Sequence, residues 1–170
     1  MVEIRSEKPE DIALVRHVHQ QAFHRANEAR LVELLRAAGK ARLSLVAEQD
    51  GQVVAHLLFS PVTLDPARPD LRFVGLAPVG VLPESQKQGI GSRLIREGLK
   101  ACREAGYEAV VVLGDLAFYS RFGCSCASAY GLGNEYGADE DFMVVELRQG
   151  ALAGITGTVK YQPEFGEANC

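Results

Sequence analysis

The sequence has no long apolar run. Its unbroken apolar stretches are far shorter than the roughly 20 residues that a membrane-spanning helix requires. The first residues, MVEIRSEKPEDI, also lack the apolar core of a signal peptide and are typical of an immediate first strand. These absences exclude a membrane protein and predict a cytoplasmic location.

Cysteine is scarce, with four residues in a chain of 170. Cys124 and Cys126 are two positions apart, Cys102 lies in a predicted helix, and Cys170 is the last residue. A cysteine-based metal site would need two clustered pairs, or cysteines with histidines at ligand spacing. Neither pattern occurs, so we expect no metal and mostly buried, reduced thiols.

The net charge of the chain is small as well. Eighteen basic and 22 acidic residues give a formal net charge of −4, and no stripe of Lys and Arg is present. Nucleic-acid binding proteins usually carry such a stripe, so the dispersed charges argue against nucleic acid as a ligand. The acidic excess is too small to select a class of partner.

The hydrophobic patterns indicate one α/β domain of mixed strands and helices. No repeat, linker or low-complexity tract interrupts the order β-α-α-β-β-β-α-β-α-β. We assign residues 1–150 to the domain and 151–170 to a C-terminal extension that packs on it. The predicted strands are 2–6, 74–82, 108–114, 141–147 and 158–161, with a hairpin over 43–62 around Asp50-Gly51. The predicted helices are 8–23, 28–38, 88–104 and 115–122, and residues 64–71, with two prolines, are predicted to be an irregular loop.

A proline and two glycines mark the centre of the chain. Pro78 lies inside the strand 74–82, where it cannot donate a ladder hydrogen bond, so a bulge or a splayed strand is expected. The stretch PESQKQGIGSRLI follows, with Gly89 and Gly91 at the start of a helical pattern. A helix N-terminus offers unpaired N–H groups and a positive dipole end to an anion. This stretch alone is equally compatible with a pyrophosphate cradle and with a tight strand-to-helix turn.

Two nucleotide-binding motifs can be excluded here. No glycine is followed by Lys-Ser or Lys-Thr, as a Walker loop requires. A dinucleotide fingerprint would need a third glycine at position 94, which is Leu, and GLGNEY at 131–136 fails the same test. The pattern that does fit is Q-x-x-G-x-G, from Gln86 to Gly91.

In this position the pattern resembles the coenzyme A signature R/Q-x-x-G-x-G/A of the GNAT superfamily of N-acyltransferases. FYSRFGC (118–124) resembles a second motif of the family, F/Y-Y-x-x-x-G-F, with Cys124 in place of the aromatic residue. The pieces VAHLLFSPV, VLPESQKQGIGS, VLGDLAFYSRFG and FMVVELRQGAL are together similar to the YhbS-type subgroup of predicted acetyltransferases. The resemblance covers most of the chain. It implies a central mixed, mostly antiparallel sheet with a splayed fourth strand and helices on both faces.

The resemblance implies acetyl-CoA as co-substrate. The splayed strand would meet the pantetheine arm through its main chain, and the loop amides would hold the pyrophosphate. Lys87 and Arg93 could add positive charge or be plain surface residues. Asp115 stands where many relatives have an Asn near the pantetheine, although it would serve equally well as a helix N-cap. The residues assigned in this way to the cofactor are Val79, Gly80, Val81, Gln86, Lys87, Gln88, Gly89, Ile90, Gly91, Ser92, Asp115, Phe118 and Tyr119.

Two residues are candidates for proton transfer. Tyr119 matches the general acid of the family, and a phenol with a pKa of about 10 can reprotonate a thiolate whose thiol has a pKa of about 8.5. The alternative for Tyr119 is a core aromatic residue. Residues 72–82 contain no carboxylate to act as base. His56, on one strand face with Val54 and Leu58, could take a proton through water, although a lone strand histidine is more often structural.

The function implied is transfer of an acetyl group from acetyl-CoA to a primary amine of a small molecule, peptide or protein, by direct attack in a ternary complex. A non-catalytic acyl-CoA-binding domain is the alternative. The acceptor would be selected by the first helix pair and the loops around 62–72 and 128–140, which carry no diagnostic motif. Further acidic candidates for holding an amine are Glu28, Glu33 and Glu135. Relatives are commonly dimers, and a homodimer stays open.

Overall fold

The computed structural model describes all 170 residues, which form two compact units. The first unit comprises Met1–Ser60, Ala77–Gly98 and Pro163–Cys170, and the second comprises Pro61–Leu76 and Leu99–Gln162. Strand β5 (Phe73–Val81) and helix α3 (Ile90–Glu104) each contribute residues to both units. None of the helices is both long enough and apolar enough to cross a bilayer.

Three antiparallel strands begin the first unit: β1 (Val2–Ser6), β2 (Leu43–Gln49) and β3 (Gln52–Pro61). The turn between β2 and β3 consists of Asp50 and Gly51, which both have positive φ, 52° and 80°. Such φ values favour Asn, Asp and Gly and suit the twist of a tight hairpin. The hairpin predicted from this dipeptide is therefore confirmed.

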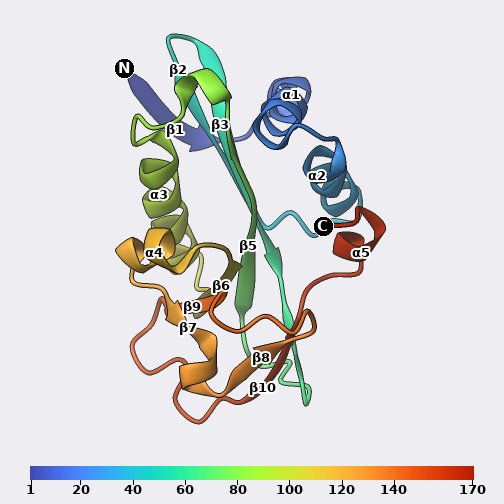
Figure 1. Ribbon diagram of the computed structural model, residues 1–170, viewed down its shortest axis with the longest axis vertical. Coiled ribbons are helices and arrows are strands. Elements are labelled where there is room, and N and C mark those ends of the chain that lie inside the picture. The colour runs from blue at the N-terminus through green and yellow to red at the C-terminus, as the bar shows by residue number, and fades with distance from the viewer. The chain divides into compact units, whose positions relative to one another are not determined.

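Helices α1 (Ile12–Phe23), α2 (Asn27–Ala37) and α5 (Glu164–Glu167) also belong to the first unit. α1 packs beside α2, and α5 lies against α2 (Figure 1). The regular helix α1 starts at Ile12, later than predicted, because Pro9–Asp11 form a 3-10 turn in front of it. The buried residues of α1 and α2 follow helical spacing: Val15, Val18, His19, Glu28, Ala29, Leu31, Val32 and Leu35.

The irregularity expected from Pro78 lies in β5. Leu82 N–H donates to the Val54 carbonyl at 2.8 Å, and Val62 N–H donates to the Phe73 carbonyl at 3.2 Å. Between these two hydrogen bonds, the β3 side advances eight residues, from Val54 to Val62. The β5 side advances nine residues, from Phe73 to Leu82. The β5 side therefore holds one extra residue, which is the definition of a β-bulge. Of the two irregularities expected from Pro78, a bulge or a splayed strand, a bulge is present in β5.

Four strands of the second unit form a mixed ladder in the order β5-β6-β9-β7. β5 pairs in parallel with β6 (Ala109–Leu113), and only Phe73–Gly75 of β5 takes part in this pairing. β9 (Phe142–Glu146) runs antiparallel to β6, and the two-residue β7 (Ser125–Cys126) runs antiparallel to β9. Parallel and antiparallel pairs in one ladder confirm the predicted mixed α/β class.

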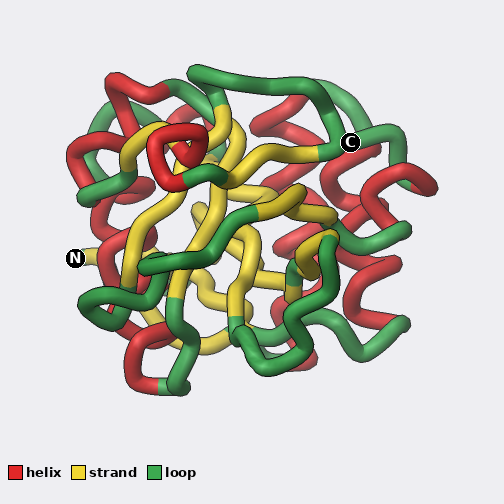
Figure 2. Tube along the Cα trace, turned by 90° about the horizontal axis from the view of Figure 1, so that it is seen from below, coloured by secondary structure: helices red, strands yellow, loops and turns green.

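A small second sheet in the same unit corrects one expectation. β4 (Thr63–Asp65) pairs antiparallel with β10 (Gly157–Lys160), and β10 pairs in parallel with β8 (Leu132–Asn134). The segment 64–71 was predicted to be irregular throughout, yet its first two residues belong to β4, because both prolines come after them. The connections 135–141 and 147–156 are loops and turns. Figure 2 draws all loops and turns in green.

Candidate functional site

The glycine-rich segment turns the chain from β5 into α3. Pro83–Ser85 form one 3-10 turn, and α3 begins at Ile90, two residues after the predicted start. Lys87 and Gly89 have positive φ of 62° and 81°. A Cβ at Gly89 would meet no atom within 4 Å, so the glycine is needed there for its backbone conformation and not for space.

The side chains of two glutamines hold this loop by hydrogen bonds to main-chain carbonyls. Gln86 Nε2 donates to the Val81 carbonyl at 3.0 Å, and Gln88 Nε2 donates to the Glu84 carbonyl at 3.2 Å. The side chain of Gln86 therefore joins the loop to the end of β5. Residues 86–89, including Lys87, are exposed. The loop is thus fixed from within while its outer surface is open to a ligand.

The first turn of α3 presents N–H groups that no acceptor inside the helix can satisfy. The first such acceptor is the Gly89 carbonyl, which receives Arg93 N–H at 3.1 Å. The side chains of Ile90 and Ser92 are buried and anchor the turn. Arg93 itself is engaged, since its guanidinium donates to the Val2 carbonyl at 2.8 Å. N–H groups at a helix start, together with the helix dipole, favour an anion.

The C-terminal part of β5 has two different faces. The half-exposed residues are Ala77, Val79 and Val81, and the buried ones alternate with them. On the buried face, a Cβ at Gly80 would lie 2.7 Å from His19 Nδ1 and 3.0 Å from His19 Cε1. Only glycine fits between the strand and this ring, because real Cβ atoms do not approach other atoms so closely.

His56 lies inside the first unit with no exposed surface. Its Nδ1 is 2.7 Å from His19 Nε2, and its Nε2 is 2.7 Å from Ser44 Oγ. Burial, followed by the nearby His19 and Arg36, holds the pKa of His56 well below its usual 6.5. The ring is therefore neutral and both nitrogens are occupied. The sequence prediction identified His56 but missed its partner His19, which stands among apolar residues on the buried face of α1.

The remaining predicted residues lie in the second unit, around α4 (Leu116–Tyr119). Asp115 Oδ1 accepts a hydrogen bond from Ala117 N–H at 3.1 Å, which confirms its predicted role as N-cap. The Phe118 ring packs edge-on against Tyr119, with centroids 5.0 Å apart. Gly114 leaves room for the Tyr119 ring, since a Cβ there would lie 2.5 Å from its Cε2.

Burial sets the protonation of the groups around Tyr119. Burial, with a smaller effect of Cys124, raises the pKa of the Tyr119 phenol to about 12, so this O–H keeps its proton at neutral pH. Burial also raises the pKa of Cys124 to about 11 and that of Cys102 to about 12. All four cysteines are free, as expected. Neither of these two thiols is a thiolate at neutral pH, so neither is an activated nucleophile.

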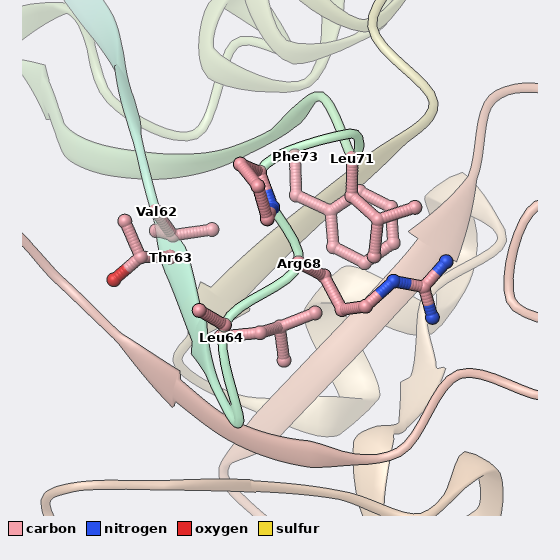
Figure 3. Close-up of a pocket in the computed structure, with 8 residues that line it drawn as sticks. Val62, Thr63, Leu64, Arg68, Leu71 and Phe73 are labelled. Atoms are coloured by element: carbon pink, nitrogen blue, oxygen red, sulfur yellow. The ribbon is translucent and has the colours of Figure 1, made fainter.

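The loop around 62–72, expected to help select the acceptor, contains a cavity of about 270 Å³ (Figure 3). The Arg68 guanidinium bonds both carboxylate oxygens of Asp70, at 3.1 and 3.0 Å, so its charge is compensated. The lining is mainly apolar and holds no carboxylate: Val62, Thr63, Leu64, Ala67, Arg68, Pro69, Leu71 and Phe73. The cavity therefore suits the apolar part of a ligand better than an ammonium group.

The three acidic residues considered for holding an acceptor amine already have ion-pair or hydrogen-bond partners. Glu28 pairs with Arg25, and Glu33 pairs with Arg16. Glu135 Oε1 accepts a hydrogen bond from Tyr161 N–H at 2.9 Å. Each carboxylate is thus engaged within its own unit.

Comparison with known proteins places these features in context. The profile of the acetyltransferase (GNAT) domain family matches residues 3–127. The chain is 42% identical to the uncharacterized N-acetyltransferase YhbS of Escherichia coli K12, over 95% of this chain and 97% of that protein. The crystal structure of Escherichia coli YhbS in complex with CoA is similar, with a TM-score of 0.92, 40% identity and coverage of 97% and 92% of the two chains. A GNAT acetyltransferase from Brucella melitensis in complex with acetyl-CoA has a TM-score of 0.81 and 39% identity, over 97% and 98%.

The substitution Gly80→Ala should lower the free energy of unfolding by about 1–3 kcal/mol, because the new methyl group displaces the His19 ring from a packed interior. Urea denaturation of the two proteins measures the difference. Gly166→Ala is the matched control: a Cβ at Gly166 meets no atom within 4 Å, so we expect a change of less than about 1 kcal/mol. Equal stability of Gly80→Ala and the unsubstituted protein would contradict the close packing of His19 on β5.

Proposed function

The chain belongs to the GNAT family of acetyltransferases, and on that premise we propose that it transfers the acetyl group of acetyl-CoA to a primary amine. The observation that carries the proposal is the glycine loop at the start of α3, whose exposed main chain and first-turn N–H groups suit a pyrophosphate. The relatives solved with CoA and acetyl-CoA, both about 40% identical to this chain, support the same co-substrate.

In this proposal the cofactor lies along the half-exposed face of β5 and over the loop. The N–H groups from Gln88 to Ser92 hold the pyrophosphate, and Gln86 keeps the loop attached to the strand end. Lys87 is exposed and adds positive charge near the phosphates. The main chain of Val79, Gly80 and Val81 receives the pantetheine arm. Asp115 and Phe118, in the second unit, are also assigned to the cofactor.

The chemistry follows from the bond that is made. The amine nitrogen attacks the thioester carbonyl, and the N–H near Val79 stabilises the oxyanion that forms. The C–S bond then breaks, and Tyr119 gives its phenolic proton to the leaving thiolate. Burial keeps the Cys124 and Cys102 thiols protonated, which argues against an acyl-cysteine intermediate at either residue.

The proton released by the amine requires an acceptor. We propose that His56 takes part in this step. Its neutral ring can accept a proton, but neither nitrogen is open to the outside. The proton would therefore reach His56 through one of its two bonded neighbours.

The direct test is release of free CoA thiol from acetyl-CoA in the presence of a panel of amines, polyamines and peptides. We expect turnover with at least one class of amine. Tight acetyl-CoA binding without turnover on the whole panel would instead favour a non-catalytic acyl-CoA-binding domain. Absence of both binding and turnover would contradict the proposal.

The substitution Gly89→Val should abolish the rise in melting temperature that acetyl-CoA causes, because a β-branched residue is strained at φ of 81° and the loop must change shape. Gly39→Val is the matched control, since Gly39 has φ of 72° and equally free surroundings. It should carry a similar intrinsic strain and still show the shift. An unchanged acetyl-CoA shift in Gly89→Val would remove the loop from the binding site.

The substitution Tyr119→Phe should lower kcat by about 100-fold, because the thiolate then leaves without its proton donor. The affinity for acetyl-CoA should change little, since the ring and its packing on Phe118 are retained. Steady-state kinetics, with calorimetric titration of acetyl-CoA, separate the two effects. If turnover of the variant equals that of the unsubstituted protein, Tyr119 is a packing residue only.

A further inference from the structure

Five side chains of the first unit form an unbroken row of hydrogen bonds. Arg36 bonds Glu7 Oε2 at 2.6 Å, and Ser44 Oγ donates to Glu7 Oε1 at 2.8 Å. Ser44 Oγ is also 2.7 Å from His56 Nε2, and His56 Nδ1 is 2.7 Å from His19 Nε2. The row leads from the partly exposed Arg36, through Glu7, to fully buried His19.

The carboxylate at one end fixes the direction of every proton in the row. Glu7, the ion-pair partner of Arg36, only accepts, so the single hydroxyl proton of Ser44 points to it. His56 Nε2 must then carry a proton and donate it to Ser44 Oγ, which leaves His56 Nδ1 as an acceptor. His19 Nε2 in turn donates to His56 Nδ1. A neutral imidazole has one N–H only, so His19 Nδ1 holds a bare lone pair.

This last nitrogen has no hydrogen-bond partner, although it is buried. It faces Gly80, where an added Cβ would lie only 2.7 Å away. Buried polar atoms without partners are few in proteins, and each calls for an explanation. A basic atom that is kept unprotonated beside the strand proposed to receive acetyl-CoA has such an explanation in proton transfer.

We propose that His19 Nδ1 is the general base of the acetyl transfer, and that His56, Ser44 and Glu7 carry the proton from it to the surface. The inference rests on the proposed function and adds to it the missing proton acceptor. His19 is the catalytic residue in this scheme, while His56 and Ser44 act through it as positioning and relay residues.

The step balances without a further reactant. In the free protein His19 Nδ1 is buried against Gly80, so the ring must move away from the strand to admit the amine. The C–N bond then forms as the amine attacks, and one N–H proton moves from the amine to His19 Nδ1. The electron pair of the C–S bond leaves with sulfur, which takes the phenolic proton of Tyr119. The products are the N-acetylated amine and CoA thiol. The relay then releases its extra proton to solvent, and Tyr119 takes a proton back from solvent.

The relay removes the difficulty of charging a buried ring. Burial lowers the pKa of His19 to about 4, with Glu28 acting weakly in the opposite direction, so an imidazolium there is unfavourable. When Nδ1 accepts a proton, His19 can release its Nε2 proton to His56, and His56 can release its own to Ser44. Both rings then change tautomer and stay neutral, and the charge that disappears is that of Glu7. The Glu7 side chain is 9% exposed and that of its ion-pair partner Arg36 is 27% exposed, which gives the proton a route to water at this end of the row.

The substitution His19→Gln tests the base, because a glutamine amide can still donate toward His56 but cannot take up a proton. We expect kcat on the best amine of the panel to fall by about 100-fold or more, with an unchanged acetyl-CoA melting shift. His17→Gln, at an exposed position of the same helix, is the matched control and should leave kcat unchanged. A folded His19→Gln protein with the kcat of the unsubstituted one would overturn the assignment.

The substitution Ser44→Ala tests the relay with His19 left in place, and it decides the matter if His19→Gln does not fold. We expect kcat to fall by about tenfold at constant KM, and Ser44→Thr, which restores a hydroxyl, to recover most of it. Full activity of Ser44→Ala would overturn the relay. Failure of the proposed function is a different result, because the unsubstituted protein would then acetylate no amine at all.

Discussion

The close approach of β5 to the His19 ring is the constraint on which the first unit depends. No side chain fits at Gly80, so the strand lies directly against helix α1 at this point. In the free protein this face of the strand is packed against the ring, while Val79 and Val81 on the other face are half-exposed. A bulge between Phe73 and Leu82 adds one residue to β5. Gln86 then bonds the end of β5 and fixes where the glycine loop begins.

In the proposed reaction, one face of β5 binds the cofactor and the other contacts the base. The half-exposed face and the loop at the start of α3 offer main-chain groups to the cofactor, which is why few charged side chains are needed there. The buried face contacts His19, the last member of a hydrogen-bonded row that begins at Glu7. A carboxylate on β5 is then unnecessary, because the base reaches the strand from α1.

The sequence predicted the features that local chemistry determines. Asp50-Gly51 specified the hairpin and Asp115 the N-cap, since each acts on its immediate neighbours, and Pro78 indicated that β5 is irregular. The short strands β4, β7 and β8 were not predicted, because two or three residues carry no periodicity and their pairing depends on distant partners. His19 was missed because it occupies a core position of its helix. Its hydrogen-bond partner His56 is 37 residues away in the sequence, so local patterns do not reveal the contact.

A row of hydrogen bonds holds His19 with a bare Nδ1, and the tautomer of that ring can be measured directly. Long-range proton–nitrogen correlation NMR on protein labelled with ¹⁵N-histidine reports which nitrogen of each ring carries the proton. At neutral pH we expect neutral rings for both His19 and His56, each protonated on Nε2 and unprotonated on Nδ1. A proton on His19 Nδ1 would contradict this expectation, because the nitrogen beside Gly80 would then be a donor and could not serve as the base.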